Sequence, residues 1–488
     1  MDINRLKQSL TTIVTLLLVG IVLVWPLVTG FVLQGKFGAT VGVLSAPNHW
    51  AMKETEFKRG WFHSEARTVL TLEGELAKQM REARHTIDPM MPVQVILIHH
   101  IQHGPVLSVE RPFLLPAAAF IETTMEFPDD TKDWLKPVFG DAAPVRVRSL
   151  IRLNGDVISR FESPAVDGDL TDGTHLQWQG IGGTLEMGHN WETVRGNLTM
   201  PLLALSDGAG QLRLQQLEIQ LDNHRHQGGL WLGEAKAAFK TLAFMVPSHP
   251  EYRFSLTGYS AMSAFREEEQ TLHALVSMDL GDFSMGGHPL GAGGFTIDLR
   301  RVDLLAFTSL YNDLKYWEQL PVAKRSAAEK QVRQTMMTQL PWLLHYSPEF
   351  GISRLEIRTP QGIVRGSLRL ALNGEGDLAV VTPADILPRF SMELEANAPL
   401  NLVLDIVQTQ VTKEMIAHGD LGGGLFGGDK LALDARDAAE KRLSALVDQG
   451  LLMRYTDRYS MSATYTKGQL GVNGRPHNEL LEKLKGIN

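Results

Sequence analysis

The feature that most constrains this chain is an uncharged, mostly apolar run over residues 10–33. A helix needs about 20 apolar residues to cross the hydrocarbon core of a bilayer, so this run can span a membrane once. Arg5 and Lys7 precede it, and basic residues tend to stay in the cytoplasm, which places residues 1–9 inside and the bulk of the chain outside. Pro26 is expected to kink or end the helix near its outer side.

The alternative for this run is a cleaved signal peptide. The run is longer than the apolar core of roughly 7–15 residues in a typical signal peptide. In addition, Val32-Leu33-Gln34 lacks the pattern of small residues expected at a cleavage site. We therefore expect an uncleaved anchor, and no later stretch is apolar for long enough to span again.

The composition beyond this run is that of an ordinary globular protein. The chain has 488 residues, 44% of them apolar and 21% charged, which is ample material for a core. Its net charge of -8 and its lack of a long basic block argue against binding to nucleic acid. It has no cysteine, which excludes disulfides, thiolate nucleophiles and cysteine-based metal sites.

Most of the chain carries the period-2 alternation of half-buried strands, from about residue 65 to residue 301. Tyr252, Phe254 and Leu256 are a clear example. No long helical pattern interrupts these segments, so residues 40–301 are expected to form a β-rich region, with a large antiparallel sheet that is either curved or folded into a sandwich.

Two local signals refine this expectation. Asn154-Gly155 is a turn dipeptide whose residues tolerate positive φ, and it predicts a hairpin. Between residues 212 and 221 the alternation changes phase once, which predicts a bulge or a short turn at Gln215-Gln216.

Helices are expected only in the last third of the chain. Residues 303–345 have the apolar spacing of two helices divided by Pro321. The second helix is expected to open near Ser326, whose hydroxyl can cap it together with Glu329.

Strands then alternate with helices to the end of the chain. Residues 400–417 and 435–452 look helical and are joined by the glycine-rich segment 419–428, and a last hairpin turns at Lys467-Gly468. The fold class is therefore mainly β with α segments (α+β), and residues 302–488 are expected to continue the preceding sheet.

Three short motifs carry a resemblance to a known family: residues 57–66, residues 103–105 and residues 465–474. With these motifs in order behind a single anchor, the chain resembles the bacterial YdgA-like family of uncharacterised envelope proteins over almost its whole length. The segment at 419–428 departs from that family. The resemblance implies a single-pass inner-membrane protein with a periplasmic domain and brings no reaction with it. The motif residues that we expect to have structural roles are Arg59, Gly60, Phe62, Ser64, His103, Gly104, Pro105, Asn473 and Gly474.

The first motif is expected to lie near the membrane. Trp61 and Phe62 are predicted to pack the first strand against the sheet. Lys58 and Arg59 could meet lipid headgroups if the motif lies close to the bilayer.

The histidines do not form a convincing metal site. On a strand, His99 and His103 share a face, but about 3.3 Å per residue separates them by roughly 13 Å, too far for one zinc ion unless the strand bends. His224 and His226 could chelate from one strand, but a polar hairpin tip is the simpler interpretation. We therefore expect no metal and no other cofactor.

Nucleophilic and phosphate-binding motifs are also incomplete. Residues 258–262 begin like a nucleophile elbow but carry Met262 in place of the second glycine. The glycine-rich run ends in Gly428-Asp429-Lys430 without the Lys-Ser/Thr ending of a phosphate loop. The run Glu267-Glu268-Glu269 is typical of a solvated loop. No catalytic residue is therefore predicted.

Three functions remain open from the sequence. The first is a non-enzymatic, membrane-anchored periplasmic protein that binds lipid or another apolar ligand on its sheet. The second is a scaffold or self-associating protein, with a homo-oligomer as one form, in envelope organisation or motility. The third is an envelope hydrolase, which is supported only by the expected location of the chain.

Overall fold

The computed structural model describes residues 50–72, 94–110, 113–320, 325–374, 388–417 and 427–479. The predicted anchor over residues 10–33 lies outside these ranges. Within them, no helix combines the length and the apolar character needed to cross a membrane. The chain divides into two compact units, residues 1–224 with 242–248 and residues 225–241 with 249–488. The domain boundary expected near residues 301–302 stays a prediction.

The first unit is an antiparallel sheet in which most strands pair with their neighbours in the chain. The order is β1-β2-β3-β6-β7-β8-β11-β12-β13, and the β9–β10 hairpin pairs with the second half of β12. These strands are β1 (Trp50–Arg59), β2 (His63–Leu72), β3 (Gln94–His103), β6 (Ala119–Glu126), β7 (Arg146–Ile151), β8 (Val157–Glu162), β9 (Val166–Asp169), β10 (His175–Trp178), β11 (Gly182–Met187), β12 (Thr193–Ser206) and β13 (Gln211–Arg225).

A small hairpin packs onto one face of this sheet. The hairpin of β4 (Val106–Glu110) and β5 (Phe113–Pro116) contributes Leu107 to a cluster with Ala117, Phe120 and Leu150. On the opposite face Ala66, Ile101 and Ala119 form a second cluster. The remaining elements of the unit are α3 (Asp129–Phe139) and a single turn, η2 (His189–Trp191).

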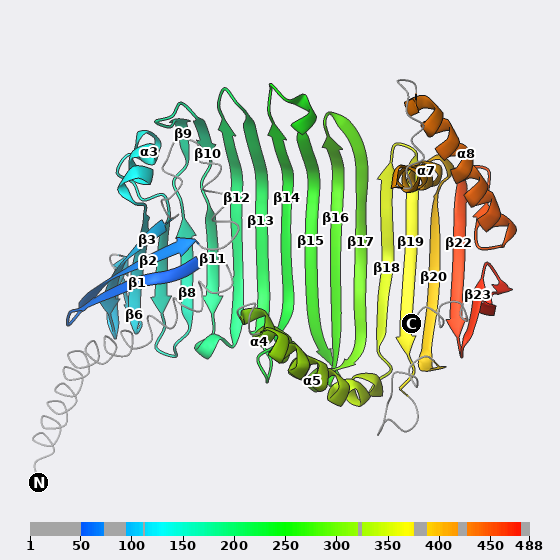
Figure 1. The fold of residues 1–488 in the computed structure, drawn as a ribbon. Coiled ribbons are helices and arrows are strands. Elements are labelled where there is room, and N and C mark those ends of the chain that lie inside the picture. The colour runs from blue at the N-terminus through cyan, green and yellow to red at the C-terminus, as the bar shows by residue number, and fades with distance from the viewer. Residues whose placement is uncertain are drawn as a thin grey trace, which may run out of the picture. The chain divides into compact units, whose positions relative to one another are not determined.

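The second unit is also an antiparallel sheet in chain order, β15-β16-β17-β18-β19-β20-β22-β23-β24, with β21 beside β22 (Figure 1). The strand β14 is divided between the two units. The bounds are β14 (Trp231–Met245), β15 (Phe254–Glu268), β16 (Thr271–Met285), β17 (His288–Asp303), β18 (Glu349–Thr359), β19 (Gly362–Leu372), β20 (Phe390–Pro399), β21 (Met453–Arg454), β22 (Arg458–Thr466), β23 (Gln469–Val472) and β24 (Arg475–Pro476), with one turn, η3 (Pro250–Tyr252).

Two helix pairs are inserted between strands of this sheet. The pair α4 (Leu304–Gln319) and α5 (Arg325–His345) follows β17, while α7 (Leu400–Ala417) and α8 (Gly427–Asp448) follow β20. Because β17 and β20 run in opposite directions, the two pairs lie at opposite ends of the strands (Figure 1).

The core of this unit lies where α4 and α5 meet the sheet. Leu272, Val302 and Leu304 are buried there, and Phe307 of α4 and Leu343 of α5 pack around them. Asp303 caps α4 by accepting a hydrogen bond from the backbone N–H of Ala306 at 2.8 Å.

The predicted class, mainly β with large antiparallel sheets, is confirmed, as are the helices over 303–345 and 400–417. The hairpin turn at Asn154-Gly155 is present, with Gly155 at φ 89°. The irregularity in the 212–221 segment falls at Gln216, whose φ is 52° and whose pairing with Pro201 is missing from an otherwise constant register.

Three predictions about helices were wrong. No helix was predicted within residues 65–301, but α3 lies there. Pro137 is inside this helix, and proline is unfavourable in a helix interior. The helix α5 begins at Arg325, which confirms the predicted start near Ser326, but Ser326 lies inside the first turn and not at the predicted cap position. The helix α8 begins at Gly427, eight residues before the predicted start at 435, and therefore includes the last two glycines of the glycine-rich segment.

Candidate functional site

The sheet of the second unit has two chemically different faces. Directly paired residues of antiparallel strands point to the same face, and successive residues of a strand point to opposite faces. One face, here called the apolar face, consists of three rows of paired residues: Phe265–Ala274–Leu299–Phe350–Leu370–Met392–Tyr465–Leu470, Ser263–Val276–Ile297–Ile352–Leu368–Leu394–Ala463–Val472, and Ala261–Met278–Phe295–Leu355–Gly366–Ala396–Met461.

The apolar face carries no charged side chain in any of these described rows. Helices α4 and α5 cover its first row near β15 to β17, where Phe265 and Leu299 pack against the core cluster. Farther from these helices the apolar side chains are half-buried. Val276 is 38% exposed, and Ile357, which lies two residues after Leu355 and therefore on the same face, is 42% exposed. A large apolar surface is therefore only partly removed from water, which is typical of binding sites for apolar ligands.

The opposite face, here called the charged face, is crossed by ion pairs within and between strands. Arg354 of β18 pairs with Asp279 of β16, and Arg358 and Arg365 both pair with Glu356, at 3.0 and 3.2 Å. These side chains are largely exposed apart from Glu356, so each pair contributes little to stability. Their effect is to keep this face solvated.

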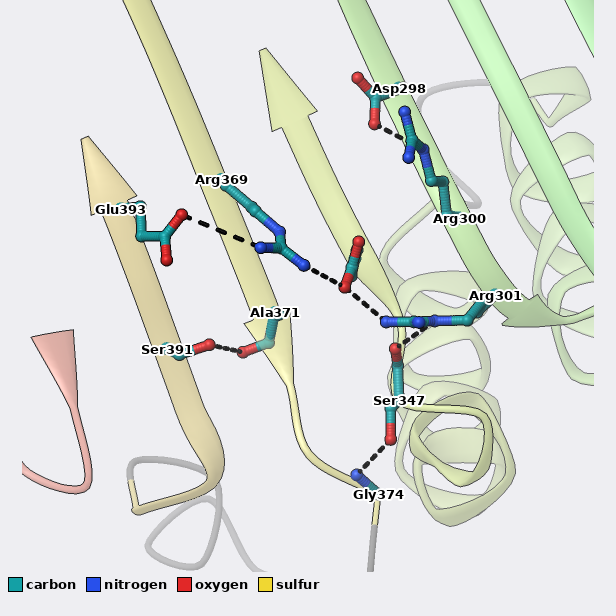
Figure 2. A network of polar contacts seen from close by, with 10 residues as sticks. Asp298, Arg300, Arg301, Ser347, Arg369, Ala371, Gly374, Ser391 and Glu393 are labelled. Carbon is teal, nitrogen blue, oxygen red and sulfur yellow. Dashed lines mark hydrogen bonds and ion pairs between the residues drawn. The ribbon is translucent and has the colours of Figure 1, made fainter. Parts of the chain in front are cut away.

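One network of polar contacts on the charged face is centred on Glu349, and Figure 2 shows it with its partners Arg301 and Arg369 labelled. Its carboxylate, only 13% exposed, accepts hydrogen bonds from Arg301 of β17 and from Arg369 of β19, the latter at 2.7 Å. Arg301 also donates to the carbonyl of Ser347 at 3.1 Å. Burial opposes ionisation of Glu349, but the hydrogen bonds and charges of Arg369 and Arg301 outweigh it and lower the pKa of this carboxyl.

A pocket of about 340 Å³ lies beside this network. Arginines pair with three of its four carboxylates, and its lining contains no histidine. The charged groups of the lining are Asp298, Arg300, Glu349, Arg369, Glu393 and Glu395.

In the first unit the structure brings two of the sequence motifs together. Ser64 Oγ lies 2.8 Å from His103 Nε2, although 39 residues separate them in the chain. The backbone N–H of Gly60 donates to Ser64 Oγ at 3.3 Å, and the N–H of His103 donates to the carbonyl of Phe62. Gly104 cannot carry a side chain, because a Cβ there would lie 1.6 Å from the carbonyl oxygen of Ala117.

This serine–histidine pair does not have the features of a catalytic pair. Ser64 and His103 are 3% and 4% exposed, and His103 Nδ1 has no partner among the described residues that could orient it as a carboxylate does in a triad. Burial, with a smaller contribution from the charge of His63, lowers the pKa of His103. The pair therefore acts as a buried polar link between β2 and β3.

The other predicted motif residues occupy separate places. Arg59 ends β1 opposite Ser64, and Pro105 follows Gly104 in the link to β4. Asn473 and Gly474 belong to the second unit, in the turn between β23 and β24. Asn473 accepts a hydrogen bond from the backbone N–H of Ser462 at 2.8 Å and donates to the carbonyl of Gly450 at 2.9 Å.

The prediction that Trp61 and Phe62 pack against the sheet was wrong. Both side chains are exposed, and their rings lie 6.4 Å apart in the turn between β1 and β2. The core cluster of this sheet contains small residues such as Ala66 instead.

The candidate metal histidines are held apart by different partners. His99 Nδ1 bonds to Thr123 Oγ1 at 2.8 Å, whereas His103 bonds to Ser64. His224 lies opposite Thr193 in the β12–β13 ladder, and His226 faces Glu267 at 3.5 Å. No group of three or more potential metal ligands forms within the described ranges.

Neither of the two faces of the second sheet was singled out from the sequence. The signal was present, because Glu349, Arg354, Glu356 and Arg358 are charged while Phe350, Ile352, Leu355 and Ile357 are apolar. The extra residue near Ser353 shifts the alternation by one, and this shift hides the pattern.

A family model described as a bacterial protein of unknown function (DUF945) matches residues 7–479. No curated protein and no solved structure matches the chain.

Proposed function

The chain belongs to the DUF945 family of bacterial proteins of unknown function, and on that premise we propose that it is a non-enzymatic envelope protein that binds an apolar ligand. In this proposal residues 10–33 anchor it in the inner membrane, and the two sheet units lie in the periplasm, as in the YdgA-like proteins that its motifs resemble. The ligand lies on the apolar face of the second unit.

The observation that carries the proposal is the contrast between the two faces of one sheet. Ion pairs keep the charged face in water, while the apolar face presents half-buried aliphatic and aromatic side chains over β16 to β22. Burying apolar surface contributes about 25 cal/mol per Å², so covering such a face with a ligand is strongly favourable.

The experiment is native mass spectrometry of the full chain, together with organic extraction and lipid analysis of the purified protein. We expect lipid at a defined stoichiometry. Substituting Ile357→Asp places a charge on the apolar face and should remove the bound lipid, because a desolvated carboxylate is costly beside hydrocarbon.

Ile363→Asp is the matched control. Ile363 is 40% exposed, close to the 42% of Ile357, but it pairs with Arg358 and so lies on the charged face of the neighbouring strand. It should leave the lipid bound. Equal loss in both variants, or a wild-type chain without lipid, would contradict the proposal.

A second candidate function is a scaffold that associates with itself or with other proteins. It is favoured by the exposed apolar side chains of α4 and α5, among them Leu305, Met336, Met337 and Trp342. Light scattering of the full chain would show a concentration-dependent mass in that case. The double substitution Leu305→Ser with Trp342→Ser should then restore the monomer mass.

A further inference from the structure

We propose that the ligand is the hydrocarbon chain of a lipid and that it lies across β18, β19 and β20 on the apolar face, over Leu355, Gly366 and Ala396. This inference rests on the proposed function and specifies both the class of ligand and its position. The three residues are directly paired and belong to the row that is farthest, among the three, from α4 and α5 and nearest to the end of β20 at which α7 begins.

The chemistry of the face selects hydrocarbon over protein. From β16 to β22 the second and third rows contain no charged side chain and no hydrogen-bonding side chain. A protein partner normally contributes about one hydrogen bond per 100–200 Å² of interface, and these rows offer it none from a side chain. A lipid chain needs none.

Helices α4 and α5 rise above the apolar face, and this argues against the sheet of a second chain as its occupant. Leu304 and Phe307 of α4 pack on the same face, against the cluster that includes Phe265 and Leu299. A helix is about 10–12 Å across and two sheets pack about 10 Å apart, so a second sheet laid flat would collide with α4 and α5. A single hydrocarbon chain is thin enough to lie beside them.

The dimensions of the rows suit one lipid chain. Strands lie about 4.8 Å apart, so the distance from β17 to β22 is roughly 19 Å across four intervals. A lipid chain that fills half of a hydrocarbon core of about 30 Å is roughly 15 Å long. The rows are therefore long enough for one lipid chain.

The third row has its smallest side chains at Gly366 and Ala396, which lie between the larger Leu355 and Met461. A Cβ added to Gly366 would meet its nearest neighbour, Leu355 Cδ2, at 3.4 Å, which is ordinary contact. An added Cβ is therefore tolerated at Gly366 without displacing backbone. Ala396, its directly paired neighbour, is the position at which the test adds a larger side chain.

The test uses palmitic acid with a photoreactive diazirine at the middle of its chain, added to the full-length protein. In the wild type we expect crosslinks to peptides of β18 to β20, located by mass spectrometry. Ala396→Phe fills the low part of the row and should weaken probe binding about tenfold or more. Glu395→Phe introduces the same ring one residue away on the charged face and should leave binding unchanged.

The outcomes separate the two proposals. Crosslinks elsewhere in the chain, or equal binding to Ala396→Phe and wild type, overturn the position while leaving lipid binding intact. No binding of the probe to the wild type overturns both proposals. A doubled mass with crosslinks between two chains identifies a second copy as the occupant. The wild-type crosslink map needs no variant, so it decides the position even if Ala396→Phe fails to fold.

Discussion

At the scale of single residues, burial determines the chemistry of the two histidines on β3. His99 is 5% exposed, and burial, with a smaller contribution from the charge of His100, lowers its pKa from 6.5 to about 4. His103 is shifted in the same direction for the same reason. Both side chains are therefore neutral at pH 7 and bond to hydroxyl groups inside the core.

The shift of His99 predicts that the first unit loses stability in mild acid. The unfolded chain takes up the proton near pH 6.5 and the folded chain only near pH 4, so the unfolded state binds more protons between these values. Stability is then complete above about pH 6.5 and falls by about 3 kcal/mol as the pH decreases to about 4.

Urea unfolding at a series of pH values, with an NMR titration of the imidazole, measures this effect. His99→Gln should flatten the dependence between pH 6.5 and pH 4. A titration of His99 near pH 6.5 in the folded protein would contradict the prediction.

The link between Ser64 and His103 predicts a second residue-scale effect. Ser64→Ala removes the hydroxyl but leaves His103 buried, with both of its ring nitrogens then lacking a partner among the described residues. An unsatisfied buried polar group costs about 1–3 kcal/mol, and the free energy of unfolding should decrease by that amount. Ser353→Ala, at an exposed serine of β18, is the control and should change stability by less than about 0.5 kcal/mol. Equal stability of Ser64→Ala and the wild type would show that the link contributes nothing.

At the scale of elements, Glu349 connects three strands, because it belongs to β18 and binds arginines of β17 and β19. Glu349→Gln keeps the shape and removes the charge, so unfolding should become easier by about 1 kcal/mol at pH 7. The pKa of Glu349 is lowered in the folded chain, so its contribution is present above the ordinary carboxyl pKa and is lost as the pH falls through the folded value.

Urea unfolding of Glu349→Gln and wild type at pH 7 and in acid measures both parts of this prediction. The difference between them should vanish in acid and shrink in 1 M salt, where the Debye length is about 3 Å. Glu395→Gln, an exposed carboxylate of β20, is the matched control. A difference that persists unchanged in acid would mean that the charge is not its cause.

The elements that the sequence predicted well are those with strong local signals. The hairpin at Lys467-Gly468 is an example, because both residues have positive φ, at 50° and 78°, as a tight hairpin turn requires. The helix α3 was missed because prolines at positions 128 and 137 flank and interrupt its pattern. The spacing of the apolar residues in α3 was too weak a helical signal to outweigh these two prolines.

At the scale of the whole molecule, the sequence predicted the class of fold but not the candidate site. Alternation along single strands indicates a sheet, and this was confirmed. Which residues share a face depends on register between strands, and bulges near Ser353 and Leu272 shift that register by one residue. Likewise, nothing local connects Ser64 with His103, since their contact exists only once β2 pairs with β3.

The order of strands within each unit has a consequence for how the protein is made. In the second unit nearly every strand pairs with the strand that precedes it in the chain, and helices α4 and α5 lie outside that succession. Contacts close in sequence form faster than distant ones. A polypeptide released N-terminus first, from a ribosome or through a translocation channel, can therefore add one strand at a time to a single growing edge, so that synthesis and assembly proceed in the same direction.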